Sequence, residues 1–451
     1  MAIAASAIFE VRSSASDGNG GFFVPGTSGT IDYSQQNAPQ LSVTDGVANG
    51  TTTITSITGG FTAAMVNNGV NIAGALYQIT AYTNTNTITV DRTVATASAL
   101  TINVGGALAT VGFIGANCSN LQFGASGCSK AYLQYASAPY LMSATANVSG
   151  GSISLGANNG SVVFIGYYQT RGDITETANL SFRPTIKANA ASFTMFNNGN
   201  NISGARSIIW DGGSYTAVNG FFGGGGGDSN WLIYNCKYQN FAGIAIQGGT
   251  GDVDYCEFTG CSTTPMQANG KRCWSHNNSA DGFGQPNGGQ ALIYCISSSN
   301  TGNGFGGGNR VNFYDKCSAY KNGGVGLYVN TGYQVSLSNS ISYGNTGYDI
   351  SATNGDQCES ISVAYGTSNA NFTNGVSANI IQLTANPFVN PDGTIADISQ
   401  VWAAFALNNT AGGGALCRGA GTPQYLDIGA VQHQDSGGGG VPRIVVPRRI
   451  W

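Results

Sequence analysis

The chain has 451 residues, of which 68 are glycine and only 8% are charged, with 17 Lys and Arg against 21 Asp and Glu. Glycine costs about 1 kcal/mol per residue inside a helix, so this composition excludes a mainly helical fold. A 41% hydrophobic content at a net charge of −4 excludes a disordered chain. The weakly acidic balance offers no broad basic surface, and no apolar run is long enough to span a membrane. We therefore expect neither a nucleic-acid partner nor membrane insertion.

The chain up to residue 398 divides into three predicted parts. Residues 1–45 are rich in Gly, Ser and Gln, which predicts an irregular N-terminal arm. Residues 46–105 alternate Thr, Ile, Val and Tyr between Gly and Asn turns, as in TTTITSIT and NTITVDRTV, which predicts a small β module. From 106 to 398 we expect a solenoid of β-strands whose early coils, up to about residue 230, are irregular. The start, MAIAASAIFEVRSS, lacks the pattern of a signal peptide, so we expect any exit from a cell to occur by lysis or by a route not encoded here.

A drifting repeat of about 21 residues runs through the second half of the chain. Its anchors are Cys236, Cys256, Cys273, Cys295, Cys317 and Ser340. Ten residues after each anchor stands an apolar residue, namely Ile246, Met266, Phe283, Phe305, Leu327 and Ile350. Five residues after the last four anchors stand Asn278, Asn300, Asn322 and Asn345. A unit this short cannot bury its apolar residues alone, so the repeat predicts stacked coils.

Stacking gives each column of the repeat a structural role. Equivalent residues of neighbouring coils lie about 4.8 Å apart, so like side chains contact like. The cysteines become small buried wall residues, and we expect them to be reduced. Asparagine suits a sharp bend between strands, where its amide can bond to the next coil. At these residues the sequence resembles the right-handed parallel β-helices of pectate-lyase-like proteins, and this resemblance implies an all-β solenoid.

The repeat fades after about residue 365. Residues 399–436 are predicted as a C-terminal cap that hides the open apolar end, with SQVWAAFALNN at 399–409 as either one helical turn or a capping strand. Residues 437–451 contain four glycines and the arm PRIVVPRRIW. Aromatic and Arg side chains anchor protein interfaces, so we expect this arm to dock on another chain, with a disordered tail as the alternative. Its candidate contact residues are Ile444, Val446, Arg448, Arg449 and Trp451.

Groups for acid–base chemistry are few. The weak candidates for catalytic residues are Asp252, Asp254, Glu257 and His276. Strand alternation places Asp252 and Asp254 on one face and Glu257 on the other, so they form no obvious pair. We interpret them as solvated charges, with a catalytic or calcium-binding role as the alternative. With two histidines and no Cys-x-x-Cys pair, we expect no metal and no cofactor.

Three further features allow functional interpretations. Tyr and Trp side chains crowd the coils, and we expect some to face outward, where they suit glycan or protein contact; the alternative is a stack that stiffens the wall. Lys271, Arg272, His276 and Asp281 form a second charged cluster, which we interpret as surface. Arg171-Gly172-Asp173 spells an integrin-binding tripeptide, which we interpret as a turn.

Several segments carry a more specific resemblance. YQTRGD at 168–173, RPTIKA at 183–188, LNNTAGGGALCRGAG with YLDIGAVQHQ at 407–434, and the stretch 61–92 look like parts of β-helix proteins encoded by tailed bacteriophages. The resemblance implies a non-catalytic structural protein on the virion surface, as a tail spike, tail fibre or capsid decoration, for host attachment or particle stabilisation. It also implies a homotrimer, other virion proteins as partners, and a host-surface glycan as a candidate ligand. The alternatives are a polysaccharide depolymerase tailspike, that is a glycoside hydrolase or polysaccharide lyase acting on capsule or O-antigen, and a bacterial β-helical adhesin.

Overall fold

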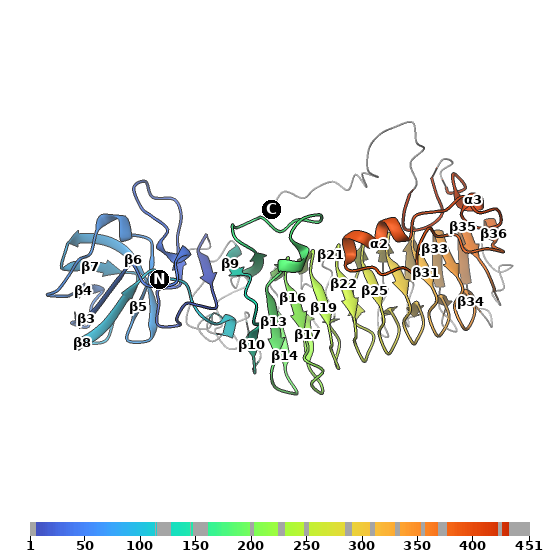
Figure 1. Ribbon diagram of the computed structural model, residues 1–451. Coiled ribbons are helices and arrows are strands. Elements are labelled where there is room, and N and C mark those ends of the chain that lie inside the picture. The colour runs from blue at the N-terminus through green and yellow to red at the C-terminus, as the bar shows by residue number, and fades with distance from the viewer. Residues whose placement is uncertain are drawn as a thin grey trace. The chain divides into compact units, whose positions relative to one another are not determined.

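A computed structural model describes residues 6–112, 114, 128–144, 146–147, 161–198, 203–223, 231–247, 252–284, 291–306, 312–329, 334–352, 357–368, 377–422 and 426–432 (Figure 1). The chain forms two compact units, Met1–Asp252 and Val253–Trp451. Short parallel strands recur coil after coil in each unit. The predicted all-β fold, a right-handed parallel β-helix with a small N-terminal β module, is confirmed. In the described part of the chain, no helix is long and apolar enough to cross a membrane.

The N-terminal β module is a closed antiparallel barrel. Its strands are β3 (Leu41–Ala48), β4 (Thr53–Thr55), β5 (Gly69–Ile72), β6 (Ala75–Asn84), β7 (Thr87–Val90) and β8 (Ala97–Val104). Alternating side chains such as Ile54, Ile88 and Ile102 point inward and are completely buried. The alternation of Thr with Ile and Val therefore produces the barrel, because one face of each strand fills the interior.

Residues expected in an irregular N-terminal arm instead belong to the solenoid. Strand β1 (Ile8–Val11) pairs in parallel with β9 (Cys128–Gln134), and β2 (Phe22–Phe23) pairs antiparallel with β1. Phe9 and Phe22 are buried and their ring centroids lie 5.2 Å apart. The scattered aromatics of this segment are thus core residues of the first coil.

Three strands make up a regular coil. In the first unit the coil strands are β9, β10 (Tyr140–Met142), β11 (Ala146–Asn147), β12 (Ser161–Tyr167), β13 (Thr185–Ala188), β14 (Thr194–Asn198), β15 (Ser203–Arg206), β16 (Ile209–Asp211), β17 (Asn219–Gly223), β18 (Trp231–Tyr234), β19 (Lys237–Gln239) and β20 (Ile246–Gln247). In the second unit they are β21 (Asp252–Asp254), β22 (Glu257–Thr259), β23 (Met266–Gln267), β24 (Gly270–Lys271), β25 (Trp274–His276), β26 (Phe283–Gly284), β27 (Ala291–Ile293), β28 (Ile296–Ser298), β29 (Phe305–Gly306), β30 (Asn312–Asp315), β31 (Ser318–Tyr320), β32 (Leu327–Val329), β33 (Gln334–Tyr343), β34 (Ile350–Ala352), β35 (Gln357–Tyr365) and β36 (Ser377–Gln382). Each strand pairs with its equivalent one coil away, as in Trp274↔Ile296 and Ile296↔Ser318.

Left-handed backbone forms two corners in each regular coil. The first corner directly precedes the cysteine column and has positive φ at Ser207, Asn235, Tyr255, Arg272, Tyr294, Lys316, Asn339, Ser362 and Asn379. The second follows four residues after the cysteine, at Asn240, Gly260, Asn277, Ser299, Lys321 and Gly344. Side chains at such positions carry a cost of about 1–2 kcal/mol, so the stack of strands must hold the corners in place.

The asparagine column forms a buried hydrogen-bonded ladder. The Asn278 side-chain amide donates to Oδ1 of Asn300 at 2.8 Å, Asn300 donates to Asn322 at 3.0 Å, and Asn322 donates to Asn345 at 2.9 Å. Each Oδ1 also accepts the backbone N–H of the preceding asparagine. Asp349 ends the ladder by accepting from Asn345. The predicted coil-to-coil bonding of the asparagines is therefore confirmed.

The cysteine and apolar columns line the interior. Seven cysteines, Cys236, Cys256, Cys261, Cys273, Cys295, Cys317 and Cys417, are free and buried. Burial raises the pKa of the Cys273 and Cys295 thiols, which keeps them protonated. In the apolar column Phe283 and Phe305 stack with ring centroids 5.2 Å apart. The expectation of reduced wall cysteines thus agrees with the free state of these seven.

The C-terminal segment, residues 383–432, contacts the coils side-on instead of only closing their end. It contains α2 (Ile398–Ala404) and α3 (Gly414–Cys417), and α2 lies beside the coil strands in Figure 1. Trp402 of α2 stacks on Tyr255, and Phe405 packs edge-on against Tyr320. Residues 399–409, expected as a helical turn or a capping strand, thus form most of a short helix on the flank of the solenoid.

Candidate functional site

The candidate carboxylates lie on two neighbouring strands of one coil. Asp254 ends β21, Glu257 begins β22, and the corner residue Tyr255 stands between them. Val253 and Phe258 fill the interior with no exposed area, so the two carboxylates point outward from different strands. Asp252 lies in β21, and its side chain is outside the described set. The structure therefore forms no carboxylate pair from Asp254 and Glu257.

Asp254 is held in a two-pronged ion pair. Nε and Nη2 of Arg272 donate to its two carboxylate oxygens at 2.8 and 2.6 Å. The Arg272 guanidinium also lies 5.4 Å from the centroid of the Tyr255 ring. Arg272 occupies the corner position one coil after Tyr255, which brings its fork onto the carboxylate. This two-pronged arrangement engages both oxygens of the Asp254 carboxylate.

Glu257 and His276 form a second, buried pair. Nε2 of His276 lies 3.3 Å from Oε1 of Glu257, and their exposed fractions are 8% and 1%. The Trp274 ring stacks on the imidazole at 3.5 Å, and its Nε1 donates to Ser298 at 3.0 Å. Nδ1 of His276 is 3.0 Å from the side-chain amide of Asn277. The histidine expected on a solvated coil is thus packed among neighbours.

Asp281 is bound by the backbone of the next coil, whereas Arg272 and His276 of the same sequence cluster pair with carboxylates. Its Oδ1 accepts the backbone N–H of Asn303 at 2.6 Å. Burial raises the pKa of the Asp281 carboxyl, although the bonds from Asn303 oppose that shift. Arg272 pairs with Asp254 and His276 with Glu257, so the cluster predicted from sequence is divided among separate partners.

The tripeptide Arg171-Gly172-Asp173 lies in a turn of the first unit. Arg171 donates to Glu10 at 2.6 Å and stacks 4.5 Å from the Tyr132 ring centroid. Asp173 accepts three backbone N–H groups, from residues 168 to 170. Burial raises the pKa of Asp173, but these amide bonds outweigh it and the pKa is lowered. Both charged side chains therefore serve the fold.

Most of the aromatic side chains that crowd the coils are not exposed. The buried ones are Tyr167, Trp210, Tyr238, Tyr255, Trp274, Tyr314 and Tyr320. The half-buried ones are Tyr168, Tyr234, Tyr294, Tyr328 and Tyr343. A stiffening role fits the first group. The second group offers surface for contact, as do the exposed Tyr215, Phe313 and Tyr348.

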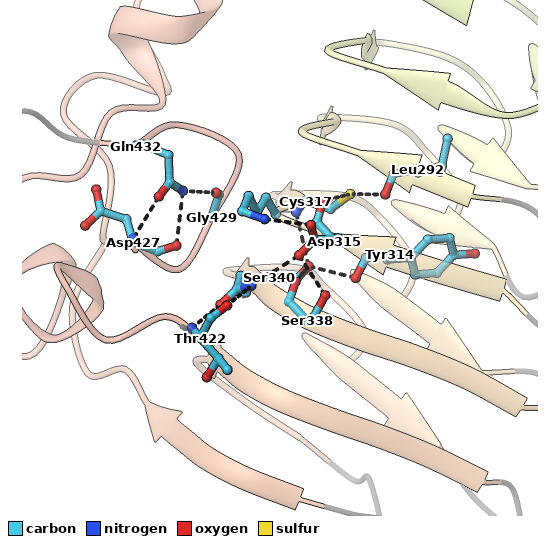
Figure 2. A network of polar contacts seen from close by, with 12 residues as sticks. Leu292, Tyr314, Asp315, Cys317, Ser338, Ser340, Thr422, Asp427, Gly429 and Gln432 are labelled. Atoms are coloured by element: carbon cyan, nitrogen blue, oxygen red, sulfur yellow. Dashed lines mark hydrogen bonds and ion pairs between the residues drawn. The ribbon is translucent and has the colours of Figure 1, made fainter. Parts of the chain in front are cut away.

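Sequence reasoning missed the contacts that fasten the C-terminal segment. Asp392 accepts from Lys321 at 2.8 Å and from the Tyr320 hydroxyl at 2.9 Å. Burial, followed by the bond to Asp392, raises the pKa of Tyr320 to about 12. Further along, Oδ1 of Asn339 accepts the backbone N–H of Thr422, and the Asn339 amide donates to the Thr422 carbonyl. These partners lie 71 to 83 residues apart in the sequence, and no periodic signal links them. Within the C-terminal segment the Gln432 amide donates to the carbonyl oxygens of Asp427 and Gly429 (Figure 2).

No metal centre is formed by the described residues, among which no three His, Cys, Asp or Glu side chains come together. Of the docking residues predicted in the last arm, Ile444, Val446, Arg448, Arg449 and Trp451 all lie outside the described residues.

Comparisons with known proteins return solved structures only. No family model matches the chain, and no curated protein does. The A-module of mannuronan C-5 epimerase AlgE6 from Azotobacter vinelandii is 18% identical over 56% of this chain and 71% of its own, with a TM-score of 0.42. Pectate lyase Pel9A is 13% identical over 68% and 88%, with a TM-score of 0.41. ORF18 of Geobacillus virus E2 is 11% identical over 61% and 57%, with a TM-score of 0.32. The activities in these names belong to those proteins.

Proposed function

We propose that this chain is a non-catalytic structural protein of a tailed-phage virion, assembled in the host cytoplasm as a homotrimer and displayed on the particle surface. Its role is host attachment or particle stabilisation. The phage-like segments at 168–188 and 407–434 support the virion assignment. The engagement of Asp254 and Glu257 supports a role without catalysis.

The main supporting observation is that two of the three candidate carboxylates, Asp254 and Glu257, already have cationic or imidazole partners. A glycosidase needs one carboxyl group that gives a proton and a second that acts on the sugar or on water. Asp254 is bound by both prongs of Arg272, and Glu257 is 1% exposed beside His276. Neither group is presented to a polysaccharide in this arrangement.

A depolymerase is the second candidate, and Asp281 is the observation that favours it. A carboxyl group with a raised pKa suits a general acid, which must carry a proton near neutral pH. Asp281 is half-buried, and burial raises the pKa of its carboxyl, which is the direction that a general acid needs. The bacterial adhesin differs from both by gene neighbourhood, since an adhesin gene would lie outside a phage locus.

The test uses purified full-length protein with capsular polysaccharide or O-antigen from the bacteria that the source particles infect. For a role in host attachment we expect the protein to bind cells or polysaccharide, and for a role in stabilisation we expect it to bind only the particles. In both cases the polysaccharide should show no new reducing ends and no unsaturated sugar products. Asp254→Asn, Glu257→Gln and Asp281→Asn should behave like the parent. Cleavage that is lost in Asp281→Asn while folding is unchanged would establish the depolymerase instead.

A further inference from the structure

One asparagine–glycine pair of the chain is presented to solvent in a turn. Asn49 and Gly50 are both exposed, and they stand between β3, which ends at Ala48, and β4, which begins at Thr53. Gly50 has a φ of +79°, a left-handed conformation that favours glycine. Asparagine followed by glycine is the pair of residues whose side-chain amide reacts most readily with its own backbone, because the glycine has no Cβ to obstruct ring closure.

The Thr51 hydroxyl is placed to assist this reaction. Oγ1 of Thr51 donates to Oδ1 of Asn49 at 2.6 Å. As the backbone nitrogen of Gly50 attacks Cγ of Asn49, negative charge develops on Oδ1, and a donor that is already in place stabilises that charge. Thr51 is itself held, because its carbonyl accepts the N–H of Val94 at 3.0 Å and its Oγ1 accepts the N–H of Thr53 at 3.1 Å.

Other asparagine–glycine pairs are protected by the fold. The glycine N–H that would have to attack is donated to a backbone carbonyl oxygen, at 2.7 to 3.0 Å, in the pairs that contain Gly20, Gly220, Gly304 and Gly323. At Asn322–Gly323 the side-chain amide is bound as well, since it donates to Oδ1 of Asn345 at 2.9 Å. Reaction at such a pair first requires these hydrogen bonds to break.

We propose that Asn49–Gly50 is a site of spontaneous deamidation and that the Thr51 hydroxyl promotes the reaction. Water is the only other reactant. Each event adds one negative charge to a chain whose net charge is −4, on the turn between two strands of the N-terminal barrel. The proposal does not depend on the proposed virion role.

The reaction has two steps. In the first, the nitrogen of Gly50 gives up its proton and forms a bond to Cγ of Asn49, the bond from Cγ to Nδ2 breaks, and ammonia leaves, which closes a cyclic imide. In the second, water adds to one of the two imide carbonyl carbons and the bond from that carbon to the ring nitrogen breaks. Opening at Cγ yields aspartate, and opening at the backbone carbonyl carbon yields isoaspartate. No oxidant or reductant is needed.

Peptide mapping of the full-length protein tests the proposal. The folded protein is incubated at mildly alkaline pH in water labelled with heavy oxygen and is then digested with chymotrypsin in ordinary water, so that only products of the incubation carry the label. Cleavage after Leu41 and Phe61 isolates residues 42–61, in which Asn49 is the only asparagine. Cleavage after Tyr320 and Leu327 isolates the control pair Asn322–Gly323 in residues 321–327.

We expect the Asn49 peptide of the folded protein to gain labelled aspartate and isoaspartate at least about tenfold faster than the Asn322 peptide. In denaturant the two rates should agree within about twofold, because the fold no longer protects Asn322. Equal rates in the folded protein would overturn the proposed site. A difference that persists in denaturant would also overturn it, since local sequence and not the fold would then set the rates.

Variants at Thr51 test the part assigned to its hydroxyl. Thr51→Val should slow the reaction at Asn49 by about threefold or more, whereas Thr51→Ser keeps a hydroxyl and should stay near the parent. The matched control is Thr55→Val, at an exposed position of β4 that should leave the rate unchanged. A Thr51→Val rate equal to or above that of the parent would contradict promotion by Thr51.

Discussion

The coils and the C-terminal segment of the second unit are stabilised in different ways. Within the coils, each interior residue contacts its own equivalents, as the ladder from Asn278 to Asn345 shows. The C-terminal segment makes contacts that occur once each, such as Trp402 on Tyr255. Because the contacts repeat, the coils can be predicted from the sequence, and a single unsuitable residue destabilises them. Because its contacts occur once each, the C-terminal segment cannot be predicted from the sequence, and the loss of any one contact matters less.

The largest expected effect is that of a charge in the apolar column. Phe305 has no exposed area and lies between Phe283 and Tyr314, with ring centroids 5.2 and 5.3 Å away. Phe305→Asp should lower the free energy of unfolding by more than about 4 kcal/mol, because an unpaired charge enters a dry wall. Denaturant unfolding followed by circular dichroism measures the loss. The matched control is Phe313→Asp, since Phe313 is 40% exposed and should cost less than about 1 kcal/mol. Equal losses in the two variants would contradict the inward assignment of the column.

The asparagine ladder should come second. Asn300 accepts from Asn278 and donates to both Asn322 and the Ser275 carbonyl, all buried. Asn300→Ala leaves these groups without partners and should cost about 2–3 kcal/mol in the same assay. Thr301→Ala, one residue away and exposed, should change stability by about 0.5 kcal/mol or less. A neutral Asn300→Ala would show that the ladder contributes nothing to stability.

The cysteine column gives a chemical prediction. Because burial raises the pKa of Cys273 and Cys295, the native protein should react slowly with thiol reagents. Denaturation without reductant should then release most of the ten thiols for titration. Recovery of two or fewer would show that the cysteines are paired instead.

The smallest expected effect is that of the Lys321–Asp392 pair, whose side chains are about half exposed, at 51% and 56%. Their hydrogen bond lowers the pKa of Asp392 and raises that of Lys321. The carboxylate contribution is present above the unfolded pKa of about 3.9 and is lost as pH falls through the lowered pKa. The lysine contribution is present below about 10.4 and is lost as pH rises through the raised pKa.

Asp392→Asn should therefore cost less than about 1 kcal/mol between those limits, because exposed pairs are screened by solvent. Stability curves of the parent, Asp392→Asn, Lys321→Gln and the double variant give the coupling energy. The curves of the parent and Asp392→Asn should converge at acid pH. A loss that stays the same from pH 2 to pH 8 would assign the cost to packing and not to charge.

The sequence predicted the coils because the columns of Cys, Asn and apolar residues repeat with the chain. It did not predict that residues 8–11 form a strand that pairs with β9 of the solenoid, since a single strand such as β1 carries no repeat. The positive-φ corners also stayed hidden, because Tyr255, Arg272 and Lys316 share a backbone conformation but no residue type.

The candidate site was predicted only as a set of residues. Alternation along one strand predicted Asp254 and Glu257 on opposite faces, which is wrong, because the corner at Tyr255 separates two strands and both carboxylates point outward. Their partners Arg272 and His276 stand on the next coil. Finding them needs the exact register of a period that drifts between 17 and 23 residues. The covering contacts of residues 383–432 depend on long-range partners such as Asp392 and Tyr320, for which a single sequence gives no signal.

The most direct test of the proposed role is the composition of the particle itself. Gradient-purified virions from the source are analysed by quantitative mass spectrometry and by antibody labelling in the electron microscope. The account predicts that this chain co-purifies at a fixed copy number divisible by three and that label lies on the particle surface. Infectious particles that lack the chain would contradict it.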